Sequence, residues 1–204
     1  MMQPDKKQQS QRAFDQQAAT YDTGIQGSHA RALYPYMLQE ITHAWGDQVL
    51  DLGCGTGALM AQVLSEDAHR QVTGLDLSEE MLAQARARLG GRAALVQGDS
   101  EHLPFPDWSF DMVYCCDSFH HYPDPAAVLA EVGRVLVPGG VFLLGDIWLP
   151  LPGRLLMNPF LRWSLEGDVR IYSRQEITAL MEQSFRQVTW RRAGGRAFVA
   201  RGVR

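Results

Sequence analysis

Short apolar runs alternate with longer amphipathic segments through the middle of the chain. The apolar runs predict buried strands at Gln48–Leu52, Gln71–Leu75, Arg92–Gln97, Phe110–Cys115 and Val141–Gly145. The intervening segments carry apolar residues at helical spacing and predict helices at Ala58–Ser65, at Ser78–Leu89 and from Asp124-Pro125 onward. Strands that alternate with helices predict a parallel sheet with helices on both of its faces.

The C-terminal part of the chain extends this pattern. Ser173 and Glu176 have the spacing of a capping box before a helical run, and the tail Arg186–Arg201 has the pattern of a hairpin around Gly194-Gly195. We therefore predict an α/β fold, a doubly wound, Rossmann-like sheet of about seven strands, mostly parallel, with an antiparallel C-terminal hairpin strand. A single domain over residues 1–204 is expected from the length.

Three segments lie outside the alternation. Residues 1–11 are rich in Gln and Lys and predict a disordered leader, whereas residues 12–45 predict helices broken near residues 22–24 and 26–27. Residues 148–170, rich in Trp, Leu, Pro and Met, follow the carboxyl end of a strand, where doubly wound sheets bind ligands. One interpretation is a lid over a substrate pocket. The alternative is a surface helix that either completes the core or forms a homodimer contact.

Composition and charge narrow the class of protein. The chain is 46% hydrophobic and 21% charged, as in ordinary globular proteins, and its net charge of −4 argues against a broad nucleic-acid surface. We expect no membrane span, because apolar stretches are too short, and a cytoplasmic location. The three cysteines have neither a disulfide framework nor metal-ligand spacing, so no metal is expected.

A glycine-rich turn carries the clearest chemical signal. Asp51-Leu52-Gly53-Cys54-Gly55-Thr56-Gly57 follows the first strand, and Asp76 ends the second. Glycines let a ligand approach the main chain closely, and an acid at that strand end can bind both ribose hydroxyls, so a nucleoside-bearing cofactor is indicated. The carboxylate of Asp51 would repel a pyrophosphate but attract the ammonium and sulfonium of S-adenosyl-L-methionine (SAM). The sequence therefore favours SAM over a dinucleotide.

These residues resemble the first motif of class I SAM-dependent methyltransferases, which the chain carries as Val49–Gly57. The similarity continues in order through Gly74–Leu82, Gly98–Phe105, Ser109–Val113 and Val135–Gly140. The N-terminal segment from Phe14 to Asp22 also resembles the leading helix of the quinone C-methyltransferase-like branch.

The resemblance implies cofactor-binding roles for residues around the strand ends. Those implied to face the methionine part and the methyl group are Asp51, Gly53, Cys54, Gly55, Asp117 and Ser118, with Tyr21 closing over the cofactor. Those implied to face the ribose and adenine are Asp76, Leu77, Met81, Gly98, Asp99 and Ser100. Three plainer alternatives stay open: Asp76 as a helix cap, Asp99 as a turn former and Met81 as a core residue.

Methyl transfer requires few catalytic groups, because the sulfonium is already a strong electrophile and positioning supplies most of the catalysis. His120 and His121 follow the fourth strand and are candidate bases for an acceptor that arrives protonated, with His121 favoured by its place nearer the next helix. Alternatively, one imidazole packs beneath the cofactor and the other caps that helix. We expect transfer to a small, apolar or aromatic acceptor. A SAM-binding sensor or scaffold, a nucleotide-dependent oxidoreductase and a protein or RNA methyltransferase remain alternatives.

Overall fold

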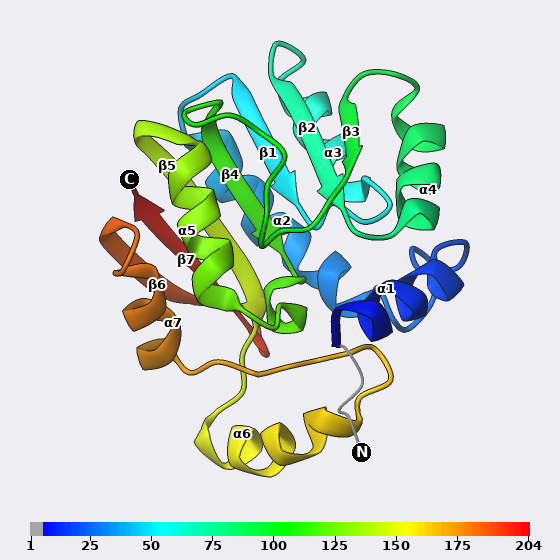
Figure 1. Cartoon of the computed structure of the whole chain (residues 1–204), viewed down its shortest axis with the longest axis vertical. Helices are drawn as coiled ribbons and strands as arrows, with labels where there is room; N and C mark the ends of the chain where they lie inside the picture. The colour runs from blue at the N-terminus through cyan, green and yellow to red at the C-terminus, as the bar shows by residue number, and fades with distance from the viewer. Residues whose placement is uncertain (1–5) are drawn as a thin grey trace.

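The computed structural model describes residues 6–204, and in these a seven-stranded sheet forms the centre of the molecule (Figure 1). The sheet order is β3-β2-β1-β4-β5-β7-β6. The strands are β1 (Gln48–Leu52), β2 (Gln71–Asp76), β3 (Ala94–Gln97), β4 (Phe110–Cys116), β5 (Leu136–Ile147), β6 (Arg186–Ala193) and β7 (Ala197–Val203). Strands β1 to β5 pair in parallel, whereas β7 runs antiparallel to both β5 and β6. The predicted fold class is confirmed.

Helices cover both faces of the sheet. They are α1 (Lys6–Gln17), α2 (Ser28–His43), α3 (Ala58–Glu66), α4 (Glu79–Leu89), α5 (Pro125–Val135), α6 (Leu151–Met157) and α7 (Arg174–Met181), with the 3₁₀ helices η1 (Phe119–His121) and η2 (Asn158–Trp163). Apolar side chains of α2, α3 and α4 pack in one core cluster with Val49 and Met112 of the sheet. Those of α5 and α7 pack in another cluster with Leu50 and Val113. Because neighbouring strand residues point to opposite faces, the two clusters lie on opposite sides of the sheet.

The predicted helix caps are present. The Ser78 side chain accepts a hydrogen bond from the Met81 amide at the start of α4, and the Asp124 side chain accepts one from the Ala127 amide at the start of α5. Ser173 and Glu176 form the complete capping box of α7. Each cap satisfies main-chain donors that the first helical turn leaves free, which explains why these helices begin where the sequence indicated.

The leader prediction is wrong over residues 6–11, which lie in α1; residues 1–5 lie outside the described residues. Polar contacts, not apolar burial, hold this helix. Lys7 Nζ lies 2.7 Å from a carboxylate oxygen of Asp99, and the Gln11 side-chain amide donates to the main-chain oxygen of Leu77 at 3.1 Å. Residues 6–11 are polar, so the spacing of apolar residues does not indicate a helix there.

The fifth strand also starts earlier than predicted. β5 begins at Leu136, which pairs with Phe110 of β4, and Pro138-Gly139-Gly140 lies inside the strand at an irregularity in the pairing. Glycine at 139 permits this irregularity because its φ is +81°.

Residues 148–170 form α6, η2 and an extended return to α7 at one end of the molecule, at the bottom of Figure 1. Leu161 is the buried side chain of η2, while most apolar side chains of α6 and η2 are exposed. Within residues 6–204, the helices are all too short or too polar to cross a membrane.

Candidate functional site

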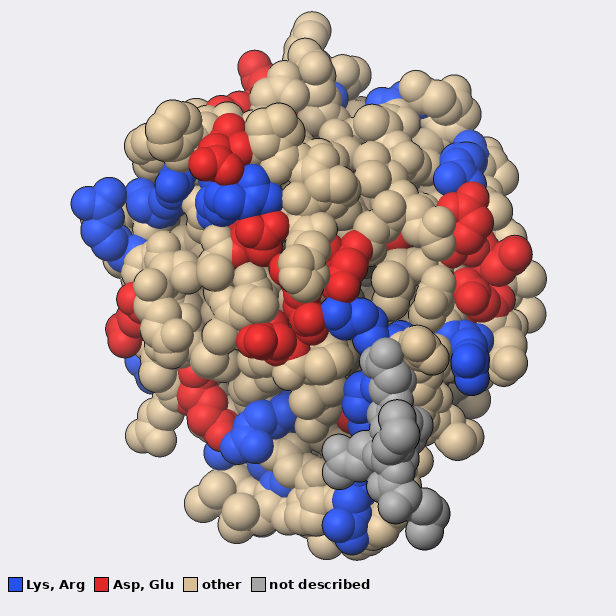
Figure 2. All heavy atoms as spheres, viewed as in Figure 1, with Lys and Arg blue, Asp and Glu red and all other residues tan. Residues whose placement is uncertain are grey.

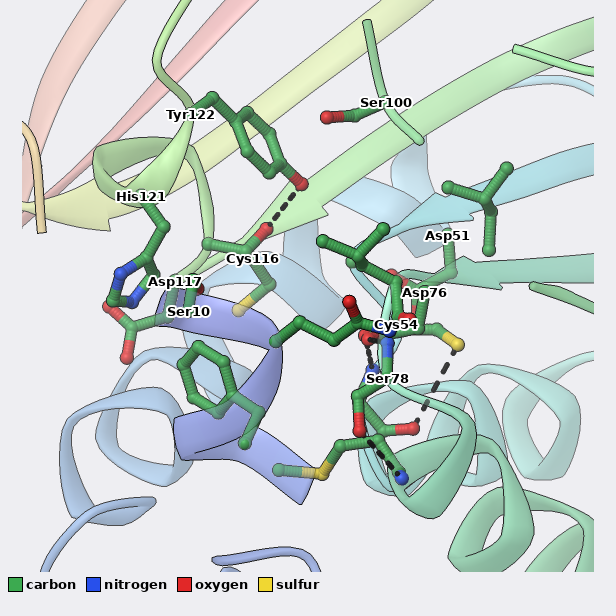
Figure 3. A pocket seen from close by; sticks show the side chains of 18 of the residues that line it. Ser10, Asp51, Cys54, Asp76, Ser78, Ser100, Cys116, Asp117, His121 and Tyr122 are labelled. Atoms are coloured by element: carbon green, nitrogen blue, oxygen red, sulfur yellow. Dashed lines mark hydrogen bonds between the residues drawn. The ribbon is translucent and has the colours of Figure 1, made fainter. Parts of the chain in front are cut away.

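A pocket lies at the carboxyl ends of β1, β2 and β4. It encloses about 980 Å³, its open mouth included. All the residues for which cofactor contact was predicted line it: Tyr21, Asp51, Gly53, Cys54, Gly55, Asp76, Leu77, Met81, Gly98, Asp99, Ser100, Asp117 and Ser118. Figure 3 shows Asp51, Asp76 and Asp117 around this space, with His121 on one side. The fold thus brings together residues that are far apart in the sequence.

The glycine-rich turn adopts a conformation that other residues rarely take. Gly53 and Gly55 have φ angles of +75° and +52°. A Cβ on Gly53 would lie 2.4 Å from Ser118 Oγ, so this position has no room for a side chain. A Cβ on Gly55 would meet nothing within 4 Å. The Gly55 main chain therefore borders open pocket space that a ligand can occupy.

Asp76 ends β2 and holds the turn. One carboxylate oxygen accepts the Gly55 amide at 2.8 Å and the other accepts the Ser78 amide at 2.9 Å. Each oxygen keeps a further lone pair that can accept a hydroxyl proton. The Ser78 side chain supplies the α4 cap. Asp76 therefore braces the turn and still offers acceptors to the pocket.

Asp51 is a buried carboxyl that lines the same pocket, with 2% of its surface exposed. Burial and, to a smaller extent, the negative charge of Asp76 raise its pKa to about 8, against the lowering effect of a hydrogen bond from Tyr114. Burial also raises the pKa of Asp76. A cation bound beside Asp51 would favour the ionised carboxylate, so this end of the pocket suits a positively charged group.

Helix α1 supplies a wall of the pocket that the sequence analysis missed. Its residues Lys7, Ser10, Gln11 and Phe14 line the space. Lys7 Nζ lies 2.6 Å from a carboxylate oxygen of Glu101 as well as contacting Asp99. Because Asp99 is already paired with Lys7, its carboxylate is fixed at the pocket edge.

A second cavity of about 730 Å³ adjoins the first. The two share Phe14, Tyr21, Asp117 and His121 in their walls. The remaining wall combines apolar and polar side chains, namely Ile147, Met157, Leu161 and Ile171 with Gln26, His29, His120, Glu166 and Asp168. The segment 148–170 therefore supplies part of this wall.

The two predicted histidines differ in charge. His120 Nδ1 lies 2.6 Å from a carboxylate oxygen of Asp146. Burial alone would lower the pKa of His120, but the carboxylates of Asp146, Asp117 and Asp168 outweigh burial and raise it to about 10. Burial and the adjacent His120 charge lower the pKa of His121 well below its usual value. At neutral pH a charged imidazolium therefore lies beside a neutral imidazole.

The structure excludes one of the alternative roles for these histidines. The helix-cap alternative is wrong, because Asp124 caps α5. His121 is buried at the boundary of the two cavities, and its Nδ1 has no hydrogen-bond partner among the described residues. His120 lines the second cavity but not the first.

Four further polar residues of the site were not predicted. Tyr122 donates or accepts a hydrogen bond with Ser118 Oγ at 2.9 Å, beneath Gly53, and His29 Nδ1 contacts Asp117 at 2.6 Å. Asp146 and Asp168 face the histidines. For Asp146 a signal existed, since an acid at the end of the apolar run Phe142–Gly145 is unusual; the others gave no local signal.

Comparisons with known proteins agree with this geometry. Residues 50–144 match the family described as "Methyltransferase domain". The chain is 38% identical over 116 residues to 27-O-demethylrifamycin SV methyltransferase of Amycolatopsis mediterranei, covering 54% of this chain and 42% of that protein. It is 42% identical over 103 residues to the fatty-acid O-methyltransferase of Mycolicibacterium smegmatis, covering 50% and 37%. The chain thus spans about two fifths of the length of these curated relatives.

The fold is shared with a solved structure over nearly its full length. That structure is a complex of the Haloferax volcanii Trm112 methyltransferase activator and a putative methyltransferase, with a TM-score of 0.79, 22% identity, and coverage of 95% of this chain and 96% of that one. At this identity the likeness concerns the fold alone. Residues 50–144 therefore match a methyltransferase family and, with the curated relatives, resemble the class I SAM-dependent methyltransferases.

Proposed function

We propose that this protein transfers the methyl group of SAM directly to a small, apolar or aromatic acceptor. One observation carries the proposal. The glycine-rich turn, the buried Asp51 and the half-buried Asp76 converge on one pocket, and a second, partly apolar cavity opens from it past His121. SAM would occupy the first pocket and the acceptor the second.

The residues present fit SAM on three counts. Gly55 leaves open space beside its main chain, where a side chain would otherwise intrude. Asp51 is a buried carboxyl whose raised pKa marks a place for a cation, and we assign it to the ammonium of SAM. Asp76 keeps free lone pairs for the ribose hydroxyls, and Leu77 and Met81 line the same pocket on the side proposed for the adenine.

SAM supplies the activated methyl group, and the chain supplies position and exclusion of water. Asp117 and His121 lie where the cavities meet, which is where the two reactants would face each other. His121, neutral at physiological pH, can accept a proton from an acceptor that arrives protonated. His120, charged and held by Asp146, can donate a hydrogen bond to an oxygen atom of the acceptor.

The apolar side chains of the second cavity support an apolar acceptor. Ile147, Met157, Leu161 and Ile171 line it. The relatives named above include a fatty-acid O-methyltransferase, whose acceptor is largely hydrocarbon. Assignment to the quinone C-methyltransferase-like branch is a finer proposal that rests on the segment Phe14–Asp22 alone.

Calorimetric titration with SAM, S-adenosylhomocysteine and NAD tests the cofactor. Gly55→Ala should abolish measurable SAM binding, because its methyl group would enter the space proposed for the cofactor. Gly90→Ala is the matched control: Gly90 has φ +57° and equally open surroundings, but lies at the end of α4 and does not line the pocket. Both variants should lose about 1 kcal/mol of stability, since both force a side chain into the left-handed region.

Three results would count against the proposal. Binding of NAD alone would favour an oxidoreductase. Equal SAM affinity in Gly55→Ala and Gly90→Ala would remove the assigned cofactor position. SAM binding without methyl transfer to any apolar or aromatic compound in a screen with tritium-labelled SAM would favour a sensor or scaffold.

A further inference from the structure

One end of the molecule presents an unusual concentration of apolar side chains to solvent. We name it the α6–η2 face; it consists of Leu151, Leu155, Leu156, Phe160, Trp163 and Leu165, which are 57–85% exposed. Among the described residues, the large apolar side chains exposed elsewhere are Ile25, Trp45 and Trp108. A monomeric protein rarely exposes large apolar side chains in one contiguous patch unless something binds there.

The charged side chains of this face are basic. Residues 149–165 contain Arg154 and Arg162 and no acidic residue. The guanidinium of Arg162 lies over the Trp163 ring, 3.8 Å from its centroid. Lys6 joins the same end, since its Nζ donates to the main-chain oxygen of Leu161 at 3.0 Å. In Figure 2 this end, at the bottom of the view, is mainly uncharged surface with basic side chains.

The nearest acidic residues turn away from the face. The Glu166 carboxylate accepts a hydrogen bond from the Gln17 side chain at 2.9 Å, and Asp168 is hydrogen bonded to Ser164. Both acids line the second cavity. The α6–η2 face therefore combines exposed Leu, Phe and Trp with arginines that have no acidic partner among residues 6–204.

We propose that the α6–η2 face docks on the surface of a bilayer that contains anionic lipids. Aromatic and aliphatic side chains flanked by arginine are the composition of segments that lie in the membrane interface, with the apolar groups among the acyl chains and the charges at the headgroups. The segment is too short to span, so it lies on the membrane. A second copy of the chain fits less well, because a symmetric contact would bring the arginines of both copies together without acidic partners in 149–165.

The same segment connects the face to the second cavity. Met157 and Leu161 line that cavity, while their neighbours Leu156 and Phe160 point to solvent. An apolar acceptor dissolved in the bilayer would thus have a short route to the cavity. This route rests on the proposed function, whereas attachment to the membrane does not.

Co-sedimentation of the full chain with vesicles tests the proposal. Vesicles of phosphatidylcholine mixed with phosphatidylglycerol should bind the wild-type protein more strongly than phosphatidylcholine alone, and high salt should weaken the difference. The double variant Leu155→Gln/Leu156→Gln should lower the partition coefficient at least about tenfold. Arg154→Gln/Arg162→Gln should lower it about tenfold on the anionic vesicles only.

A pair of tryptophan variants supplies the matched control. Trp163→Gln and Trp45→Gln each remove an indole of similar exposure, 60% and 54%, but only the first lies on the α6–η2 face. Trp163→Gln should weaken vesicle binding and Trp45→Gln should leave it unchanged. The two leucines and the two tryptophans are exposed, so thermal unfolding of their variants should be unaffected, and SAM titration should give wild-type affinity.

Several results would overturn the inference. They are wild-type protein that stays in the supernatant with both vesicle types, equal losses for Trp163→Gln and Trp45→Gln, or a concentration-dependent dimer that Leu155→Gln/Leu156→Gln dissociates. Loss of SAM binding bears on the proposed function and not on the membrane proposal, so the two can fail separately.

Discussion

The buried carboxyl of Asp51 should destabilise the ligand-free protein, and its removal gives a prediction with a calculable size. Asn has nearly the same shape as a protonated Asp side chain but cannot ionise. We therefore expect Asp51→Asn to raise the free energy of unfolding while weakening SAM binding at least about tenfold, since a charge-assisted hydrogen bond is lost.

The magnitude follows from the two pKa values of the group. The folded protein holds the Asp51 proton up to pH about 8, whereas the unfolded chain loses it near the usual value of 3.8. A folded pKa above the unfolded value means that the stability from this group is full below pH about 4 and is lost as pH rises to 8. At about 1.4 kcal/mol per pH unit, the variant should gain about 3–4 kcal/mol over the wild type between pH 5 and pH 8.

Urea unfolding of both proteins at pH 5, 6, 7 and 8 measures this difference. Titrating groups remote from Asp51 are common to the two proteins, so their contributions cancel, whereas the coupled carboxyl of Asp76 contributes to the measured difference. A free-energy difference that stays constant with pH would refute the reasoning, because it would mean that Asp51 ionises in the folded protein near its usual pKa. Saturating SAM should reduce the pH dependence of the wild type, since the ammonium favours the ionised carboxylate.

Three further predictions concern the same site. Asp76→Ala should weaken SAM binding at least about tenfold by calorimetry, because hydrogen bonds to a charged group contribute about 1.5–3 kcal/mol; an unchanged dissociation constant would contradict its ribose role. His121→Ala should keep SAM affinity and lose turnover, whereas His69→Ala, at an exposed position outside both cavities, should keep both; full activity of His121→Ala would exclude it as the base. The ion pair with Lys7 lowers the pKa of Asp99 against the effect of burial, so Lys7→Gln should raise that pKa and weaken SAM binding. NMR titration of the carboxyl measures the first effect and calorimetry the second; an unchanged pKa or an unchanged SAM affinity would contradict the prediction.

The sequence predicted the strands and the glycine-rich turn around the first pocket well, because adjacent residues determine these elements. Strands β1 and β4 are mostly apolar and buried, and β2 buries Val72, Gly74 and Leu75, as expected for strands covered on both faces. The turn at Gly53 and Gly55 needs glycine for its positive φ angles. Buried strands and positive-φ turns can therefore be predicted from a few adjacent residues.

The acceptor side was predicted less well because its residues meet only in the folded chain. His29, Asp146 and Asp168 come from three distant segments; Asp146 is unusual at the end of an apolar run, but His29 and Asp168 have no local signal. The first half of helix α1, residues 6–11, escaped prediction for a related reason, since partners such as Asp99 lie more than ninety residues away.

The way in which α1 is attached has a consequence for exchange of the bound nucleoside. Ser10 is the buried residue of this helix, and much of its attachment consists of polar contacts to Leu77, Asp99 and neighbouring residues. Detaching α1 therefore exposes little apolar surface and leaves both core clusters intact, so it belongs to the low end of the local-opening free energies in the molecule. The helix can act as a hinged wall that opens to release one cofactor and admit the next while the sheet stays still, with amide hydrogen exchange in α1 faster than in β1 or β4.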